Sequence, residues 1–217
     1  MTTFSDYAVP GDRPLPVLLL VDTSGSMGQH GKLAAQNESI GQMIDAFLLD
    51  SRTRGAIRIA VIAFGGESAE LLVAPTPVEQ VRWIPPGEAS GRTPLGTALR
   101  MANEVLVDPA FKPQNALKAT MVLTSDGIPT DDWEPPLQEL LASRAGGQAN
   151  RIAVAIGEDA DEAMLERFCS DEVPVLKAHE GHDIVEYFRR ITLSVTRGLT
   201  SGSYGRSLPD LDLDDLL

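Results

Sequence analysis

Continuous apolar runs alternate with stretches of helical periodicity along this chain, and that alternation restricts its fold more than any other feature. Apolar residues recur at helical spacing between the runs, as in Ile40, Met43, Ile44, Phe47 and Leu48. Strands that are apolar throughout are typical of parallel sheets covered by helices on both faces. We therefore expect one doubly wound, Rossmann-like α/β domain, a three-layer sandwich with a six-stranded, mostly parallel sheet. The predicted strands are 16–21, 57–64, 69–73, 119–124, 151–156 and 175–178.

The ends of the chain and one internal connection depart from this pattern. The connection 74–92 contains four prolines and is long enough to indicate a functional loop, with one short helix inside it. A last helix is expected over about 183–195, and Gly198 is expected to end it. Beyond that glycine the composition becomes Gly/Ser-rich and then alternates acidic and apolar residues, which is typical of flexible segments. The expected units are an N-terminal extension (1–14), one domain (15–197) and a flexible linker with an acidic-apolar tail (198–217).

Composition excludes several classes of partner. The 217 residues carry a net charge of -13, which disfavours binding to nucleic acid or to an anionic membrane. No apolar run has transmembrane length, and the first residues lack a signal-peptide pattern. Cys169 is the single cysteine, so no internal disulfide can form, and we expect it to be packed rather than reactive. These features together favour a cytoplasmic protein.

Three segments with oxygen-bearing side chains follow predicted strands or precede a predicted helix. The first is the run Asp22-Thr-Ser24-Gly-Ser26, directly after the first strand. Thr93 stands immediately before a helix that begins near Leu95, and Asp126 follows the fourth strand. In open parallel sheets the carboxyl ends of the strands meet at one edge, where ligands collect. Hydroxyl and carboxylate oxygens are hard ligands, so the set predicts a Mg²⁺ or Mn²⁺ site.

This combination resembles the von Willebrand factor A family and its metal-ion-dependent adhesion site. The family pattern is Asp-x-Ser-x-Ser, then a Thr, then an Asp, and this sequence matches it at Asp22, Ser24, Ser26, Thr93 and Asp126. The resemblance implies a Mg²⁺ or Mn²⁺ held directly by the two serines and the threonine, with the aspartates often acting through water. It also implies a short antiparallel strand at one edge of the sheet.

The segment 124–133, with the sequence TSDGIPTDDW, is most similar to the TerY branch of that family. Members of that branch are bacterial cytosolic proteins of tellurite resistance. The resemblance implies a non-enzymatic, metal-dependent module in a bacterial stress or defence system. Its partner would be a protein that supplies an Asp or Glu to the metal, such as a kinase or phosphatase encoded nearby. The acidic tail, 210–215, is a candidate for self-association, because its carboxylates could reach the metal site of a neighbouring copy.

The sequence bears on four other functions. A phosphate-binding P-loop fails because Ser26 replaces its first glycine and Leu33 its Ser/Thr, and a serine-hydrolase elbow fails because Ser24 replaces a glycine. A haloacid-dehalogenase-like phosphatase would use Asp22 as nucleophile with Mg²⁺, Lys118 and the pair Asp131-Asp132. In that enzyme class Ser24 stands where the general acid is needed. A scaffold in which the metal only fixes the loops remains a second alternative. Otherwise Asp131, Asp132 and Glu134 are expected in the solvated first turn of a helix.

Overall fold

The computed structural model describes residues 13–50, 53, 55–171 and 173–201. Residues 1–12 of the predicted N-terminal extension and the whole acidic tail, 210–215, lie outside the described residues. Fourteen elements follow one another, among them the short 3₁₀ helices η1 and η2. They are β1 (Leu15–Asp22), η1 (Gly25–Gly28), α1 (Lys32–Leu49), β2 (Ile57–Gly65), β3 (Ser68–Pro77), η2 (Val78–Gln80), α2 (Leu95–Val107), β4 (Thr120–Ser125), α3 (Glu134–Ala142), α4 (Arg144–Gly147), β5 (Asn150–Ile156), α5 (Glu162–Phe168), β6 (Leu176–Ala178) and α6 (Gly181–Ser201).

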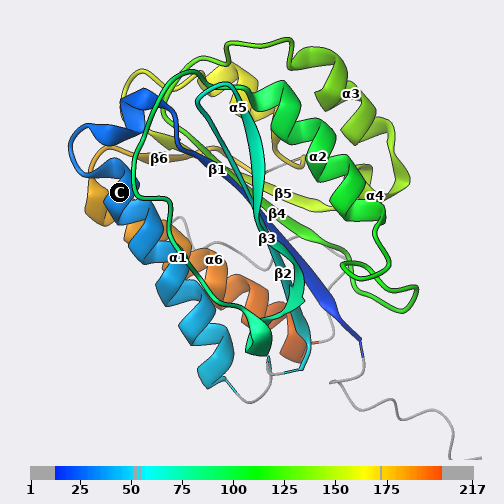
Figure 1. Ribbon diagram of the computed structural model, residues 1–217. Coiled ribbons are helices and arrows are strands. Elements are labelled where there is room, and N and C mark those ends of the chain that lie inside the picture. Colours follow the sequence, from blue (N-terminus) through cyan, green and yellow to red (C-terminus); the bar gives the residue numbers. More distant parts are fainter. Residues whose placement is uncertain (1–12, 51–52, 54, 172, 202–217) are drawn as a thin grey trace, which may run out of the picture.

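The predicted fold class is confirmed. The six strands form one sheet in the order β3-β2-β1-β4-β5-β6, and every neighbouring pair is parallel except β2 with β3. Helices α1 and α6 cover one face of the sheet, while α2 and α3 cover the other (Figure 1). Strand order reverses between β1 and β4, so the carboxyl ends of these two central strands form the switch point at which α/β sheets bind ligands.

Strand β1 shows why the apolar runs predicted a sheet buried on both faces. All eight of its residues are buried. Val17, Leu19 and Val21 pack on the side of α1 and α6, whereas Leu18 and Leu20 pack on the side of α2, α3 and α5. The alternation follows from the two-residue period of side chains along a strand.

Two boundaries differ from the prediction. Strand β3 is the predicted antiparallel edge strand, but it is longer than expected and continues to Pro77, with register shifts in its pairing to β2. Proline is tolerated there because an edge strand has one side without ladder hydrogen bonds. Helix α6 does not stop at Gly198 but continues to Ser201, so the predicted boundary between domain and tail falls inside this helix. Glycine within a helix costs only about 1 kcal/mol relative to alanine, which tertiary packing can offset.

Two smaller predictions are confirmed. The short helix expected inside the connection 74–92 is η2. Cys169 is buried at the end of α5, and this burial raises the pKa of its thiol to about 11, which makes it unreactive at neutral pH. None of the helices in the described part of the chain has the length and apolar content needed to cross a membrane.

Candidate metal centre

The centre of the candidate site is formed by two carboxylates at the ends of adjacent strands. Asp22 is the last residue of β1, and Asp126 comes directly after β4. The two strands pair in parallel up to Val21 and Thr124, so their ends lie side by side. Both aspartates are 0% exposed. Two buried carboxylates in one place need compensating hydrogen bonds or positive charge, since their desolvation is costly.

Asp22 is fixed by hydrogen bonds to both of its carboxylate oxygens. Oδ1 accepts from the backbone N–H of Ser24 at 2.8 Å, and Oδ2 accepts from Ser125 Oγ at 2.8 Å. Burial raises the pKa of Asp22, and this effect outweighs the hydrogen bonds from Ser24 and Ser125, which lower it. A nearby divalent cation would favour the charged carboxylate. Each carboxylate oxygen keeps a further lone pair, so these bonds leave Asp22 able to contact a cation directly or through water.

The two serines connect the first loop to Asp126. Ser24 Oγ and Ser26 Oγ are 3.2 Å apart, and Ser26 Oγ donates to Asp126 Oδ1 at 2.6 Å. The other carboxylate oxygen of Asp126 accepts from Lys32 Nζ at 2.9 Å. Four of the five predicted residues therefore form one continuous group of contacts, consisting of Asp22, Ser24, Ser26 and Asp126.

Thr93 is held beside this group through its neighbours in the chain. The carbonyl oxygen of Gly91 accepts from the backbone N–H of Gly25 at 3.2 Å, and Ser90 N–H donates to the Thr23 carbonyl at 2.9 Å. These bonds attach the segment before α2 to the loop that carries Ser24 and Ser26. Thr93 itself is 6% exposed.

The N-terminus of α2 is capped from a distant loop, which corrects the prediction for Asp131. Glu134 lies in the first turn of α3 as predicted, whereas Asp131 and Asp132 precede that helix. The Asp131 carboxylate instead accepts from Gly96 N at 2.8 Å, Thr97 N at 2.9 Å and Thr97 Oγ1 at 3.1 Å. A carboxylate in this position satisfies N–H groups that lack partners within the helix and interacts favourably with its dipole.

Thr130 makes a second connection between the same two loops. Its Oγ1 accepts from Thr93 N–H at 3.0 Å, and its own N–H donates to the Thr93 carbonyl at 3.0 Å. Together with the Asp131 cap, these bonds hold the Thr93 segment against the loop that follows Asp126. Hydrogen bonds thus connect the segment that carries Thr93 to the loop that carries Asp126.

Several supporting residues were not identified from the sequence. Gln36 is fully buried on α1, where its Nε2 donates to the Asp22 carbonyl at 3.0 Å and its Oε1 accepts from Thr124 Oγ1 at 2.6 Å. The sequence could have indicated this residue. Gln36 precedes Ile40 by one helical turn, so it is a polar residue on the apolar face of the predicted helix. Ser125, Lys32 and Asp131 gave no such signal.

The arrangement needed for the phosphatase alternative is not formed. Lys118 is exposed and precedes the first residue of β4, whereas Asp22 and Asp126 lie at the opposite end of the sheet. A strand of six residues spans roughly 20 Å, so Lys118 cannot reach a group bound at Asp22. The Asp131 carboxylate is engaged in capping α2. The lysine that does reach the site is Lys32.

The chemistry of the converging side chains fits a hard divalent cation. Across the described ranges, no group of three or more His, Cys, Asp or Glu residues is placed to hold a metal ion. The set at the switch point instead combines carboxylate and hydroxyl oxygens, which are the ligands that Mg²⁺ and Mn²⁺ accept. Two negative charges, both removed from solvent, provide the electrostatic attraction.

Comparison with known proteins identifies a matching family profile. The family profile described as "von Willebrand factor type A domain" matches residues 17–128, slightly more than half of the chain. No curated protein matches the sequence significantly.

Three solved structures are similar in fold. A von Willebrand factor type A protein from Catenulispora acidiphila is 20% identical with a TM-score of 0.64, and the match covers 85% of this chain and 43% of that one. Proximal thread matrix protein 1 from the mussel byssus, described "with zinc occupied MIDAS motif", is 16% identical with a TM-score of 0.63, covering 85% and 48%. The vWF domain of the type V pili tip protein Mfa5 from Porphyromonas gingivalis is 12% identical with a TM-score of 0.66, covering 86% and 96%. This chain thus spans less than half the length of the first two.

Proposed function

This chain belongs to the von Willebrand factor type A domain family, and we propose that it is a metal-dependent protein-binding module. It would hold one divalent cation, Mg²⁺ or Mn²⁺, and use that cation to bind an acidic side chain of a protein partner. The proposed ligand set is the complete metal-ion-dependent adhesion site, Asp22, Ser24, Ser26, Thr93 and Asp126.

One observation carries the proposal. Two fully buried carboxylates, at the ends of the two central strands, are joined at the switch point of the sheet through the backbone N–H of Ser24 and the hydroxyls of Ser24 and Ser26. Lys32 pairs with Asp126, but among the described residues no cationic side chain pairs with Asp22, so the burial of this second carboxylate costs desolvation energy. A divalent cation at this place would offset that cost.

The roles of the side chains follow from their contacts. Ser24 and Ser26 have hydroxyls close enough to share one cation, and Thr93 would approach it from the segment before α2. Asp126 would orient the Ser26 hydroxyl, and Asp22 would fix the serine loop through the Ser24 backbone N–H, by the hydrogen bonds already described. When bound, the cation supplies an acceptor position for an external carboxylate oxygen, which is a charge-assisted contact in a partly dry site. No covalent bond needs to break.

Known relatives support part of this proposal. A solved structure of similar fold is described with a zinc-occupied site of this type, so a divalent metal in this family position has a precedent. Our choice of Mg²⁺ or Mn²⁺ rests on the all-oxygen ligands of this chain. Domains of this family are typically interaction modules rather than enzymes. The setting in bacterial tellurite resistance, with a kinase or phosphatase as partner in the cytoplasm, is proposed from the resemblance of TSDGIPTDDW alone, as is self-association through the acidic tail.

Affinity purification tests the proposal directly. The wild-type chain in Mg²⁺ should recover a partner that is lost when EDTA is added, and Ser24→Ala should lose the same partner with the metal present. Ser68→Ala is the matched control, because Ser68 is exposed on the edge strand β3.

The same experiment separates the alternatives. If EDTA and Ser24→Ala leave the captured proteins unchanged, the chain does not bind partners through a metal. If metal then still raises the unfolding temperature, the scaffold interpretation explains the site better.

A further inference from the structure

Lys32 is placed at the candidate metal centre by an unusual turn. It is the first residue of α1, and the two residues before it have left-handed backbone, with φ of 52° at His30 and 71° at Gly31. A non-glycine residue in that region is uncommon and carries a conformational cost. The side chain reaches across to Asp126, with 2.9 Å between Nζ and Oδ2, and it is 15% exposed.

The Lys32 ammonium also lies close to Gly157, directly after β5. This glycine has φ of +78°, and a Cβ atom there would lie 3.0 Å from Lys32 Nζ and 3.4 Å from Cε. A larger residue would therefore be strained and would push the lysine away. The ammonium thus contacts a buried carboxylate and lies near a position that has no side chain.

Lys32 also borders a surface hollow of about 640 Å³. The carboxylates of Glu158, Asp159 and Glu180 line the same hollow, so it does not itself attract an anionic ligand. An ammonium group has three N–H donors, and Asp126 accepts from one of them, which leaves two donors that Asp126 does not use.

Lys32 changes the charge of the site as a whole. The carboxylates of Asp22 and Asp126 together cancel the charge of one divalent cation. Adding the ammonium of Lys32, which contacts Asp126, leaves this contacting set with a net charge of about one positive unit, which favours an anionic ligand at the metal itself although carboxylates line the neighbouring hollow. The same ammonium repels the cation, so it weakens metal binding.

We propose that Lys32 is a specificity-determining residue that lowers the affinity for metal and raises the affinity of the metal-loaded site for a partner's carboxylate. This inference rests on the proposed function. A merely structural lysine would support both binding steps, so its removal would weaken both. The proposal predicts effects of opposite sign.

The test compares Mn²⁺ binding and peptide binding in four variants of the full chain. Lys32→Met and Lys32→Gln remove the charge, Lys32→Arg keeps it, and Lys118→Met removes an equal charge from an exposed position at the far end of β4. Manganese alone is titrated first, by electron paramagnetic resonance. A short peptide with one Asp is then titrated into the Mn²⁺-loaded protein, and the Asn version of the peptide serves as its control.

Both neutral variants should bind Mn²⁺ roughly tenfold more tightly than wild type, the size of effect expected for removing one nearby charge at high effective dielectric. They should bind the Asp peptide roughly tenfold more weakly, while Lys32→Arg and Lys118→Met stay close to wild type. Unchanged or weaker Mn²⁺ binding in both neutral variants would overturn the role of Lys32 and leave the proposed function standing. Failure of the wild-type chain to bind Mn²⁺ would overturn both.

Discussion

Replacing Asp126 with alanine is expected to lower the affinity for Mn²⁺ at least about a hundredfold. Even partners that only orient a metal ligand contribute 10–100-fold to affinity. Asp126 is placed to do more, because it is fully buried and accepts from both Ser26 and Lys32. Its removal leaves the Ser26 hydroxyl without its acceptor and the Lys32 ammonium without its counter-charge.

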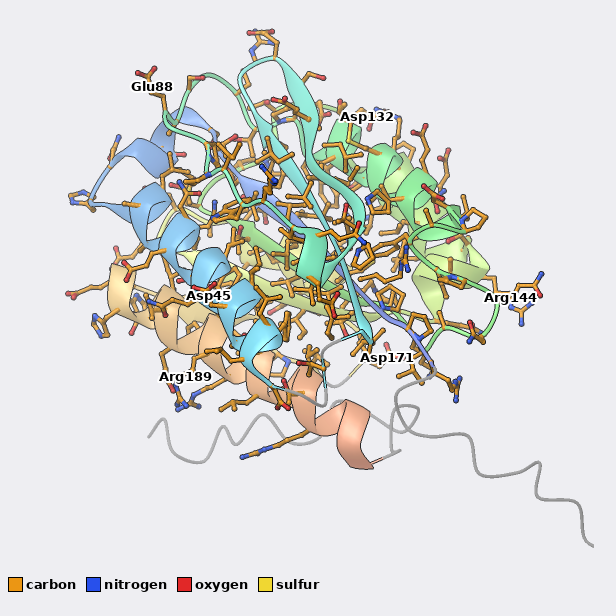
Figure 2. The ribbon with its side chains drawn as sticks, turned by 60° about the horizontal axis from the view of Figure 1, so that its bottom comes forward. Asp45, Glu88, Asp132, Arg144, Asp171 and Arg189 are labelled. Atoms are coloured by element: carbon orange, nitrogen blue, oxygen red, sulfur yellow. The ribbon has the colours of Figure 1, made fainter. Side chains whose placement is uncertain are left out.

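The same substitution should also reduce folding stability. Breaking a largely buried ion pair from one side typically costs about 3 kcal/mol, because the remaining charge keeps its desolvation penalty. Isothermal titration with Mn²⁺ and urea denaturation measure the two effects. Asp132→Ala is the matched control, since Asp132 lies on the outside of the molecule (Figure 2). Similar Mn²⁺ affinities for the two variants would show that Asp126 is not part of a metal site.

Replacing Gly91 with alanine is expected to destabilise the fold and to weaken the metal centre. Gly91 has φ of +66°, and a Cβ atom there would lie 2.5 Å from Gly66 Cα, so backbone would have to move. Strained backbone and overpacking each cost on the order of 1–3 kcal/mol, and we expect a loss of about 3 kcal/mol in the free energy of unfolding.

The displacement should also affect the metal centre. The Gly91 carbonyl accepts from Gly25, so moving it separates the Thr93 segment from the loop that carries the serines. We expect Mn²⁺ affinity to fall roughly tenfold, as for loss of a group that orients a ligand. Gly87→Ala is the control, because Gly87 belongs to the same connection and a Cβ atom there would have no atom of the described residues within 4 Å. Equal stability of the two variants would contradict the close approach of the two loops.

Local patterns were sufficient to predict the sheet but not all of its boundaries. The central strands are continuous apolar runs, so their positions followed directly from burial on both faces. Strand β3 continues through a segment with two prolines, Pro75 and Pro77, which sequence rules assign to a loop. Its strand conformation depends on pairing with β2, a contact that no local pattern encodes.

At the candidate site, too, the ligand residues could be predicted from local sequence, whereas their hydrogen-bond partners could not. Asp22, Ser24 and Ser26 share one loop, and each remaining residue of the set directly follows a strand or precedes a helix. Their supporting partners are remote in sequence, as in the bonds from Lys32 to Asp126 and from Ser125 to Asp22, with separations of 94 and 103 residues. The roles of Lys32 and Ser125 can therefore be recognised only in the folded structure, where the distant segments lie together.

The most direct test of the central claim is a crystal structure of the chain grown with Mn²⁺, with anomalous scattering used to locate the metal. We expect one strong anomalous peak at the carboxyl ends of β1 and β4, with the hydroxyl oxygens of Ser24, Ser26 and Thr93 as direct ligands at about 2.0–2.3 Å, the range for small divalent ions with oxygen ligands. A peak coordinated by other residues, or no peak at saturating Mn²⁺, would contradict it.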